Sequence, residues 1–127
     1  MNFLCDTHAF LWFAGGDSRL RQDQREALED TGNIIFLSSV SSTEIAIKHS
    51  IGKLPLPESP EIYVPRLRER VQFSELPLDE RASLRLATLP LLHRDPFDRL
   101  LICQALTLEI TIVTSDSHVR QYDVPTL

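Results

Sequence analysis

The sequence contains few of the features that would indicate a secreted, disulfide-bonded or membrane-spanning protein. Its two cysteines, Cys5 and Cys103, lie in apolar stretches and lack the CxxC spacing of zinc and redox sites, so we expect two buried, unpaired thiols. No apolar run approaches the length of a membrane helix. The first residues, MNFLCDTHAFLWF, contain neither a basic segment nor a small-residue cleavage site, which argues against a secretory signal. We therefore expect a cytoplasmic protein that binds no membrane.

A surplus of positive charge is also missing. The chain has 13 Lys and Arg against 18 Asp and Glu, a formal net charge of −5. This excludes a protein that wraps nucleic acid through bulk positive charge, although bound cations would allow an acidic enzyme to act on it. An acidic chain also suits a basic protein partner. The 127 residues, 43% of them hydrophobic, suffice for one domain with its own core, which we place at 1–127.

Short apolar runs separated by helical patterns indicate an α/β fold. Strands are expected at residues 2–5, 34–38, 71–76 and 110–114, and helices at 8–13, 18–30, 41–51, 60–70, 77–89 and from 95 onwards. Ser18 is the expected N-cap of the second helix, and Ser41 and Glu44 have the spacing of a capping box in the third, which Gly52 would end. Buried strands without polar alternation, separated by helices, predict a mainly parallel central sheet.

Four acidic residues stand where buried strands end or helices begin. Asp6 follows the first strand, and Asp116 follows the last one. Glu44 lies at the start of the helix after the second strand, and Asp98 lies in the first turn of the helix in HRDPFDRLLICQAL. In a parallel sheet all four would meet at the carboxyl ends of the strands, where α/β proteins bind ligands. Taken singly, each acid has an ordinary role as a helix cap or turn residue. Together the four would repel one another, and the pattern provides no Lys or Arg as their partner.

Clustered carboxylates without basic partners require a cation. Oxygen ligands favour Mg²⁺, with Mn²⁺ as a second choice, over zinc or copper. The histidines His8, His49, His93 and His118 are scattered without HxxxH or HExxH spacing, so we expect them to be surface or packing residues. A magnesium ion held by a few carboxylates keeps several waters, and such sites recur in enzymes that cut or transfer phosphate esters.

Four motifs along nearly the whole chain carry a family resemblance. They are LCDTHAFLW, SSTEIAIKHSIGKLPLP, HRDPFDRLLICQAL and TIVTSD, in that order. Together they resemble the PIN-domain family, and within it the VapC-type toxin ribonucleases of bacterial type II toxin–antitoxin pairs. The resemblance implies a three-layer fold and a Mg²⁺-dependent endoribonuclease that cleaves RNA phosphodiesters with a metal-activated water, its site built from Asp6, Glu44, Asp98 and Asp116. It also implies a homodimer and a tight antitoxin whose basic side chain reaches into the acidic pocket.

Further residues are candidates for contacts around this site. Thr7 and Ser115 flank site acids and would orient them or a bound water, although turn and cap hydroxyls explain them equally well. Asp95 is interpreted mainly as the cap of the helix that follows it. Lys48 and Arg99 are candidates for contacts with the RNA backbone, with a solvated surface position as the open alternative.

The family pattern is not matched everywhere. Thr43 stands where the family often has a bulky aromatic residue, and Ser117 stands where a further acid sometimes occurs. Neither change removes one of the four main acids, so we expect an active enzyme. Trp12 and Phe13 are expected mainly in the core, with a groove for an antitoxin segment as a second possibility.

Other protein classes also gather acids at strand ends. Receiver domains and haloacid-dehalogenase-type phosphatases need a second acid close to Asp6, where Thr7 and His8 stand, and receivers need a late lysine, whereas the last lysine here is Lys53. Two alternatives stay open. One is a catalytically silent PIN module that binds metal or a partner, and the other is a solitary PIN nuclease in RNA processing.

Overall fold

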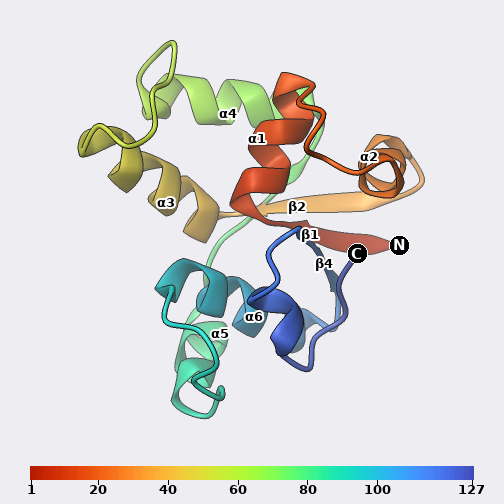
Figure 1. Cartoon of the computed structure of the whole chain (residues 1–127), viewed down its shortest axis with the longest axis vertical. Coiled ribbons are helices and arrows are strands. Elements are labelled where there is room, and N and C mark those ends of the chain that lie inside the picture. Colours follow the sequence, from red (N-terminus) through yellow and green to blue (C-terminus); the bar gives the residue numbers. More distant parts are fainter.

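Four short strands pair in a parallel sheet, which confirms the predicted α/β fold (Figure 1). The computed structural model describes residues 1–127. The strands are β1 (Asn2–Cys5), β2 (Ile34–Ser38), β3 (Ser74–Leu76) and β4 (Thr111–Val113), in the order β3–β2–β1–β4. In the central pairings, Leu4 lies opposite Phe36 in β2 and opposite Ile112 in β4.

Helices cover both faces of this sheet. They are α1 (Thr7–Gly15), α2 (Gln22–Glu29), α3 (Ser39–Ser50), α4 (Pro60–Arg70), α5 (Glu80–Leu84) and α6 (Pro96–Leu108), with two short 3₁₀ turns, η1 (Arg85–Ala87) and η2 (Val119–Gln121). Figure 1 shows α1, α2 and α4 on one side of the sheet and α5 and α6 on the other, with α3 extending from the end of β2. None of these helices is both long and apolar enough to cross a membrane.

Strand side chains alternate between two hydrophobic cores. Phe3 and Cys5 pack with residues of α1, α2 and α4, whereas Leu4 packs with residues of α6 on the opposite face. Burial on both faces explains why the strands show no polar alternation in the sequence. Cys5 and Cys103 are both buried and unpaired, as predicted.

Two helix starts differ from the predictions. α2 begins at Gln22 with Arg21 at the N-cap, because the preceding residues form a separate turn in which Asp17 accepts from the Arg19 and Leu20 backbone N–H groups. α3 begins at Ser39, and the hydroxyl of Ser38 accepts from the Val40 N–H at 3.0 Å. The proposed capping box of Ser41 and Glu44 is therefore wrong, since both residues lie inside α3 and are buried.

Other boundaries follow from how neighbouring helices end. The predicted strand at 71–76 shortens to β3 because residues 71–73 close α4, with the Phe73 N–H donating to the Arg68 carbonyl. The predicted helix at 77–89 splits into α5 and η1, although Asp79 caps its start by accepting from the Ala82 N–H at 2.8 Å. α3 ends as expected near Gly52, whose φ of +75° favours glycine.

A buried glutamine joins α2 to the C-terminal segment. Gln24 is 0% exposed, and its Nε2 donates to the carbonyls of Thr114 and Leu127, both at 3.0 Å. Its Oε1 accepts from the Arg21 N–H and from the Ser115 hydroxyl. The final residues also pair with β4 through an isolated bridge between Ile112 and Thr126.

Replacing Gln24 with leucine should destabilise the protein strongly. The change removes the four hydrogen bonds made by a fully buried amide, so we expect the free energy of unfolding to fall by about 2–4 kcal/mol. Urea unfolding followed by circular dichroism measures the effect. Gln22→Leu on the same helix is the matched control, because Gln22 is exposed and bonds only Glu26. Equal losses in the two variants would contradict the role assigned to Gln24.

Candidate metal centre

Asp6 combines a structural role with a position at the end of the sheet. It directly follows β1, and its Oδ1 accepts from the Ala9 N–H at 2.8 Å, which caps α1. Its own N–H donates to the Val113 carbonyl of β4, so the carboxylate stands where two neighbouring strands end. The residue is only 6% exposed. Burial raises the pKa of Asp6, although hydrogen bonds from Thr114 and Ala9 oppose this increase.

Glu44 is buried on α3 and has two partners. The Thr7 hydroxyl donates to its Oε1 at 2.6 Å and lies 2.9 Å from the Ser41 hydroxyl oxygen. The Lys48 ammonium, one turn further along α3, lies 2.5 Å from its Oε2. The Thr7 hydroxyl thus bonds the Glu44 carboxylate of α3.

The ion pair between Lys48 and Glu44 corrects one premise of the sequence analysis. One of the acids does have a basic partner, because the helical spacing of four residues brings the Lys48 and Glu44 side chains together. The hydrogen bond to Glu44 raises the pKa of Lys48 against the effect of burial, and the charges of Asp95 and Asp98 add to the increase. One ammonium thus faces several carboxylates and leaves the cluster with excess negative charge.

Asp98, Asp116 and His93 converge beside this pair. One ligand atom from each lies within 4.8 Å of the others, and His93 Nε2 is 3.1 Å from Asp98 Oδ2. Burial raises the pKa of Asp98 to about 8, and the charges of Asp95, Asp116, Glu44 and Asp6 add to the increase. The charges of the other three predicted acids therefore all affect the ionisation of Asp98.

Asp95 and Asp116 also support the local backbone. Asp95 caps α6 by accepting from the Phe97 N–H at 2.8 Å and the Asp98 N–H at 3.3 Å, as expected for a cap. Asp116 accepts from the His118 N–H at 2.8 Å through Oδ1. Its Oδ2 has no protein hydrogen-bond partner and is available to a ligand.

Two candidate contact residues point elsewhere. Arg99 donates to the carbonyls of Pro90 and Leu89 and to the Tyr122 hydroxyl, so its two terminal nitrogens hold the loop before α6. The Ser115 hydroxyl donates to Gln24 at 3.3 Å, which makes it part of the α2 attachment. Spacing alone placed both beside an acid, but each side chain follows its own tertiary partner.

His93 is the site residue that the sequence patterns missed. Its ring bonds Asp98 and stacks on His118, with the ring centroids 4.3 Å apart. The search for paired histidines could not find it, because its partner is a carboxylate five residues away across the start of α6. The signal was its position in the HRDPFD motif, immediately before the helix cap.

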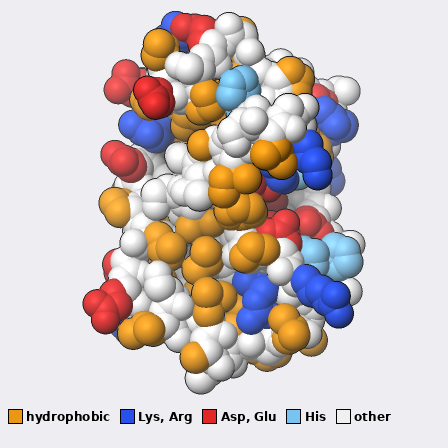
Figure 2. Space-filling view, turned by 90° about the vertical axis from the view of Figure 1, so that its left-hand side faces the viewer, with side chains coloured by type: hydrophobic (Ala, Val, Ile, Leu, Met, Phe, Trp, Pro, Cys, Tyr) orange, Lys and Arg blue, Asp and Glu red, His pale blue; other side chains and the backbone are white.

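The donor set suits a hard divalent cation. Carboxylate oxygens predominate, with one imidazole beside them, and after burial their mutual repulsion is the second cause of the raised pKa of Asp98. Mg²⁺ or Mn²⁺ would relieve this repulsion through the ligand type each prefers. Figure 2 shows a face of the molecule where acidic side chains lie beside histidine and Lys or Arg side chains, next to a band of hydrophobic ones.

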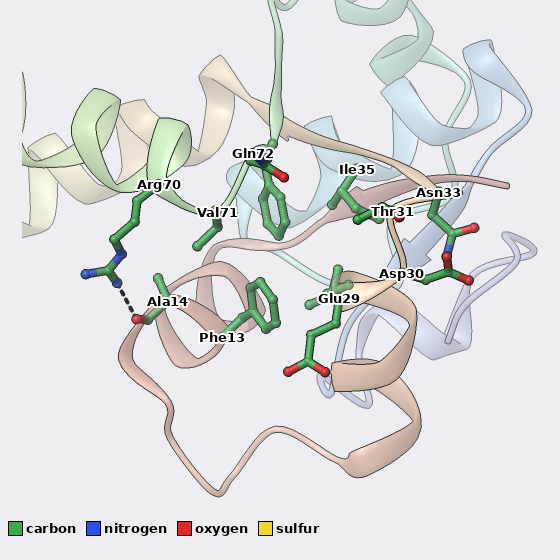
Figure 3. Close-up of a pocket in the computed structure, with 12 residues that line it drawn as sticks. Phe13, Ala14, Glu29, Asp30, Thr31, Asn33, Ile35, Arg70, Val71 and Gln72 are labelled. Atoms are coloured by element: carbon green, nitrogen blue, oxygen red, sulfur yellow. Dashed lines mark hydrogen bonds between the residues drawn. The ribbon is translucent and has the colours of Figure 1, made fainter.

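The largest cavity lies away from these acids. It has a volume of about 400 Å³ and opens between the C-terminal ends of α1, α2 and α4 (Figure 3). Phe13 lines it and stacks on Phe73 with centroids 5.6 Å apart, whereas Trp12 packs against His8 and Arg19. Only Phe13 of the two predicted groove residues therefore faces a hollow, and that hollow contains none of the four acids.

Comparison with known proteins identifies the family. The model of the PIN domain matches residues 3–125. The chain belongs to the PIN-domain family. This PIN domain is 42% identical over 57 residues to Ribonuclease VapC16 of Mycobacterium tuberculosis, a match that spans 45% of this chain and 40% of that relative's length.

Solved structures share the fold of this PIN domain over its whole length. VapBC2 from Rickettsia felis, solved bound to a promoter DNA fragment, matches with a TM-score of 0.74 and 15% identity, covering 100% of this chain and 98% of that chain. VapBC-1 from nontypeable Haemophilus influenzae matches with a TM-score of 0.67 and 16% identity, covering 100% and 97%. The three-layer arrangement predicted from the family resemblance is thus confirmed.

The raised pKa of Asp98 predicts a pH-dependent effect of Asp98→Asn on the metal-free PIN domain. The folded state keeps a proton on Asp98 up to about pH 8, whereas the unfolded chain loses it near its usual pKa of 3.8. The contribution of Asp98 to stability is therefore greatest below pH 3.8 and falls as pH rises to about 8. Asparagine cannot ionise, so the stability of the variant relative to the wild type should increase as the pH rises through this window.

Urea unfolding in a chelator at about pH 5 and about pH 8.5 measures this effect. Between these two pH values, we expect the free energy of unfolding of Asp98→Asn to rise by about 1–3 kcal/mol relative to the wild type. This is less than the full pKa shift implies, because solvent screens part of the carboxyl group. Asp123→Asn, at an exposed carboxyl, is the control. A gain that is the same at both pH values would contradict the electrostatic coupling.

Proposed function

We propose that this chain is a Mg²⁺-dependent endoribonuclease and the toxin component of a type II toxin–antitoxin pair. The observation that supports the proposal is that burial and the charges of neighbouring acids, among them Asp116, Glu44 and Asp6, raise the pKa of Asp98 to about 8. A group of acids that disfavours ionisation this strongly is suited to binding a cation, which would stabilise the charged carboxylates. The relative named Ribonuclease VapC16 supports the choice of RNA as substrate.

The four acids are proposed to hold the cation, some of them through water. When bound, Mg²⁺ or Mn²⁺ would supply positive charge to the phosphate and make a coordinated water more acidic. Asp116 is proposed to accept the proton of the water, because its Oδ2 is unpartnered while both oxygens of Glu44 are engaged. In-line attack by the water would leave a 5′-phosphate and a 3′-hydroxyl.

Thr7 and Lys48 are proposed to support this chemistry from α1 and α3. Thr7 fixes Glu44 through a 2.6 Å hydrogen bond and so limits the rotation of a buried carboxylate. Lys48 remains partly exposed and carries its charge to the edge of the cluster, within reach of an incoming phosphate. Arg99 is not included, since its donors are used by the loop before α6.

A basic antitoxin, a homodimer and a cytoplasmic location complete the proposal. The net charge of −5 and the acid cluster suit a partner that inserts a basic side chain. Large hydrophobic side chains are exposed on α3 and at its C-cap (Ile47 and Ile51), at the end of α5 (Leu84) and before α6 (Leu91 and Leu92), and these would be covered by a partner or a second copy. The structural relatives VapBC2 and VapBC-1 support a toxin–antitoxin assignment.

Replacing Asp6 with asparagine should abolish RNA cleavage and preserve the fold. Asparagine still accepts from the Ala9 N–H as a helix cap but lacks the charge that a cation needs. We expect Mg²⁺-dependent cleavage of total RNA to fall by at least about 100-fold, and EDTA to abolish it in the wild type. Sequencing of the cleaved ends, with circular dichroism to check folding, measures both effects.

Asp123→Asn is the control for this experiment because Asp123 is exposed and has none of these partners. Full activity of Asp6→Asn would reject the site assignment. A wild-type protein that binds Mg²⁺ but cleaves no tRNA, rRNA or mRNA would favour the silent PIN module instead.

A further inference from the structure

Two residues, Arg99 in α6 and Tyr122 near the C-terminus, hold the loop before α6 in place as a clamp. Tyr122 is only 5% exposed, and its hydroxyl oxygen accepts from the backbone N–H groups of Leu92 and His93 at 3.1 and 3.0 Å. Arg99 donates to the same oxygen at 3.0 Å and to the Pro90 carbonyl at 2.8 Å. The backbone around His93 is therefore fixed both to α6 and to the C-terminal segment.

The clamp also determines where the His93 side chain lies. Its ring is half-buried, stacks nearly parallel on His118 with an interplanar angle of 2°, and places Nε2 3.1 Å from Asp98 Oδ2. Asp98 is held from its backbone as well, because its N–H donates to Asp95. Backbone and side-chain restraints thus converge on one carboxylate of the acid cluster.

The hydrogen bond between His93 and Asp98 gives His93 a role that requires no direct metal ligation. Carboxylates that bind a metal are usually hydrogen-bonded in turn by outer groups that fix their orientation. Here the nitrogen with a protein partner is Nε2, and that partner is the carboxylate itself, while Nδ1 has no protein hydrogen-bond partner. An Nε2–H donor would hold Asp98 Oδ2 and leave Oδ1 for the cation.

We propose that His93 is a positioning residue that orients Asp98 for the divalent cation, and that the Tyr122–Arg99 clamp sets its position. The inference rests on the metal site of the proposed function. It adds a residue that is not one of the four acids, and it gives the C-terminal segment a part in building the site. Fixed orientation lowers the conformational cost of binding a cation, so its loss should weaken affinity without removing a ligand.

Calorimetric titration of the whole chain with Mn²⁺ alone tests this role. His93→Leu removes the donor, and we expect its Mn²⁺ affinity to fall by about 10-fold or more. His93→Gln retains an amide N–H near the position of Nε2 and should bind within about 3-fold of wild type. Tyr122→Phe leaves His93 and all four acids in place but releases the loop, and should also weaken binding. His49→Leu, a half-buried histidine bonded to the Leu54 carbonyl, is the matched control.

Thermal unfolding without metal separates positioning from general stability. A variant that folds like wild type but binds Mn²⁺ more weakly supports the proposal, and rescue by glutamine strengthens it. Wild-type affinity in His93→Leu would overturn it. Pulsed electron paramagnetic resonance of Mn²⁺ in the wild type gives a second readout, since nitrogen coupling would make His93 a ligand and reject the positioning role. Absence of Mn²⁺ and Mg²⁺ binding by the wild type would reject the proposed metal site itself.

Discussion

Repulsion among carboxylates at one end of the sheet is the constraint on which the rest of this site depends. Parallel pairing of β1 with β4 brings Asp6 to the end of both strands, and α3 and α6 add Glu44 and Asp98 from the sides. Burial and the neighbouring charges together raise the pKa of Asp98 to about 8. A protein gains no stability from such an arrangement, so its presence is best explained by a ligand that the folded chain must bind.

The fold tolerates this repulsion because most of the acids also make local bonds. Asp6 caps α1, Asp95 caps α6 and Asp116 closes the turn before η2, so each retains a favourable backbone interaction when no cation is bound. Glu44, which caps nothing, is compensated by Lys48 and Thr7 instead. The same dual use explains why single residues in the sequence could be interpreted equally well as caps or as ligands.

Local sequence rules predicted the features that depend on neighbours along the chain. Buried β-branched strands, the Asp95–Pro96 helix start and the stop at Gly52 all express short-range preferences, and each was predicted correctly. Glu44 was placed in the wrong turn because Ser38, not Ser41, caps α3. The contacts of Arg99 and His93 could not be predicted locally, because both residues bond Tyr122, which lies more than twenty residues further along the chain.

The acid cluster has a consequence for any RNA substrate. Without a cation, the carboxylates around Asp98 outnumber the single ammonium of Lys48, so on the proposed function the local charge would oppose the binding of an RNA phosphate. A divalent cation reverses this balance, and by linkage a bound phosphate must then increase the affinity for the cation. Cation and RNA would therefore bind cooperatively. On the proposed function, a chain of net charge −5 would act on a polyanion without a large basic surface, because the positive charge at the scissile bond would come with the cation.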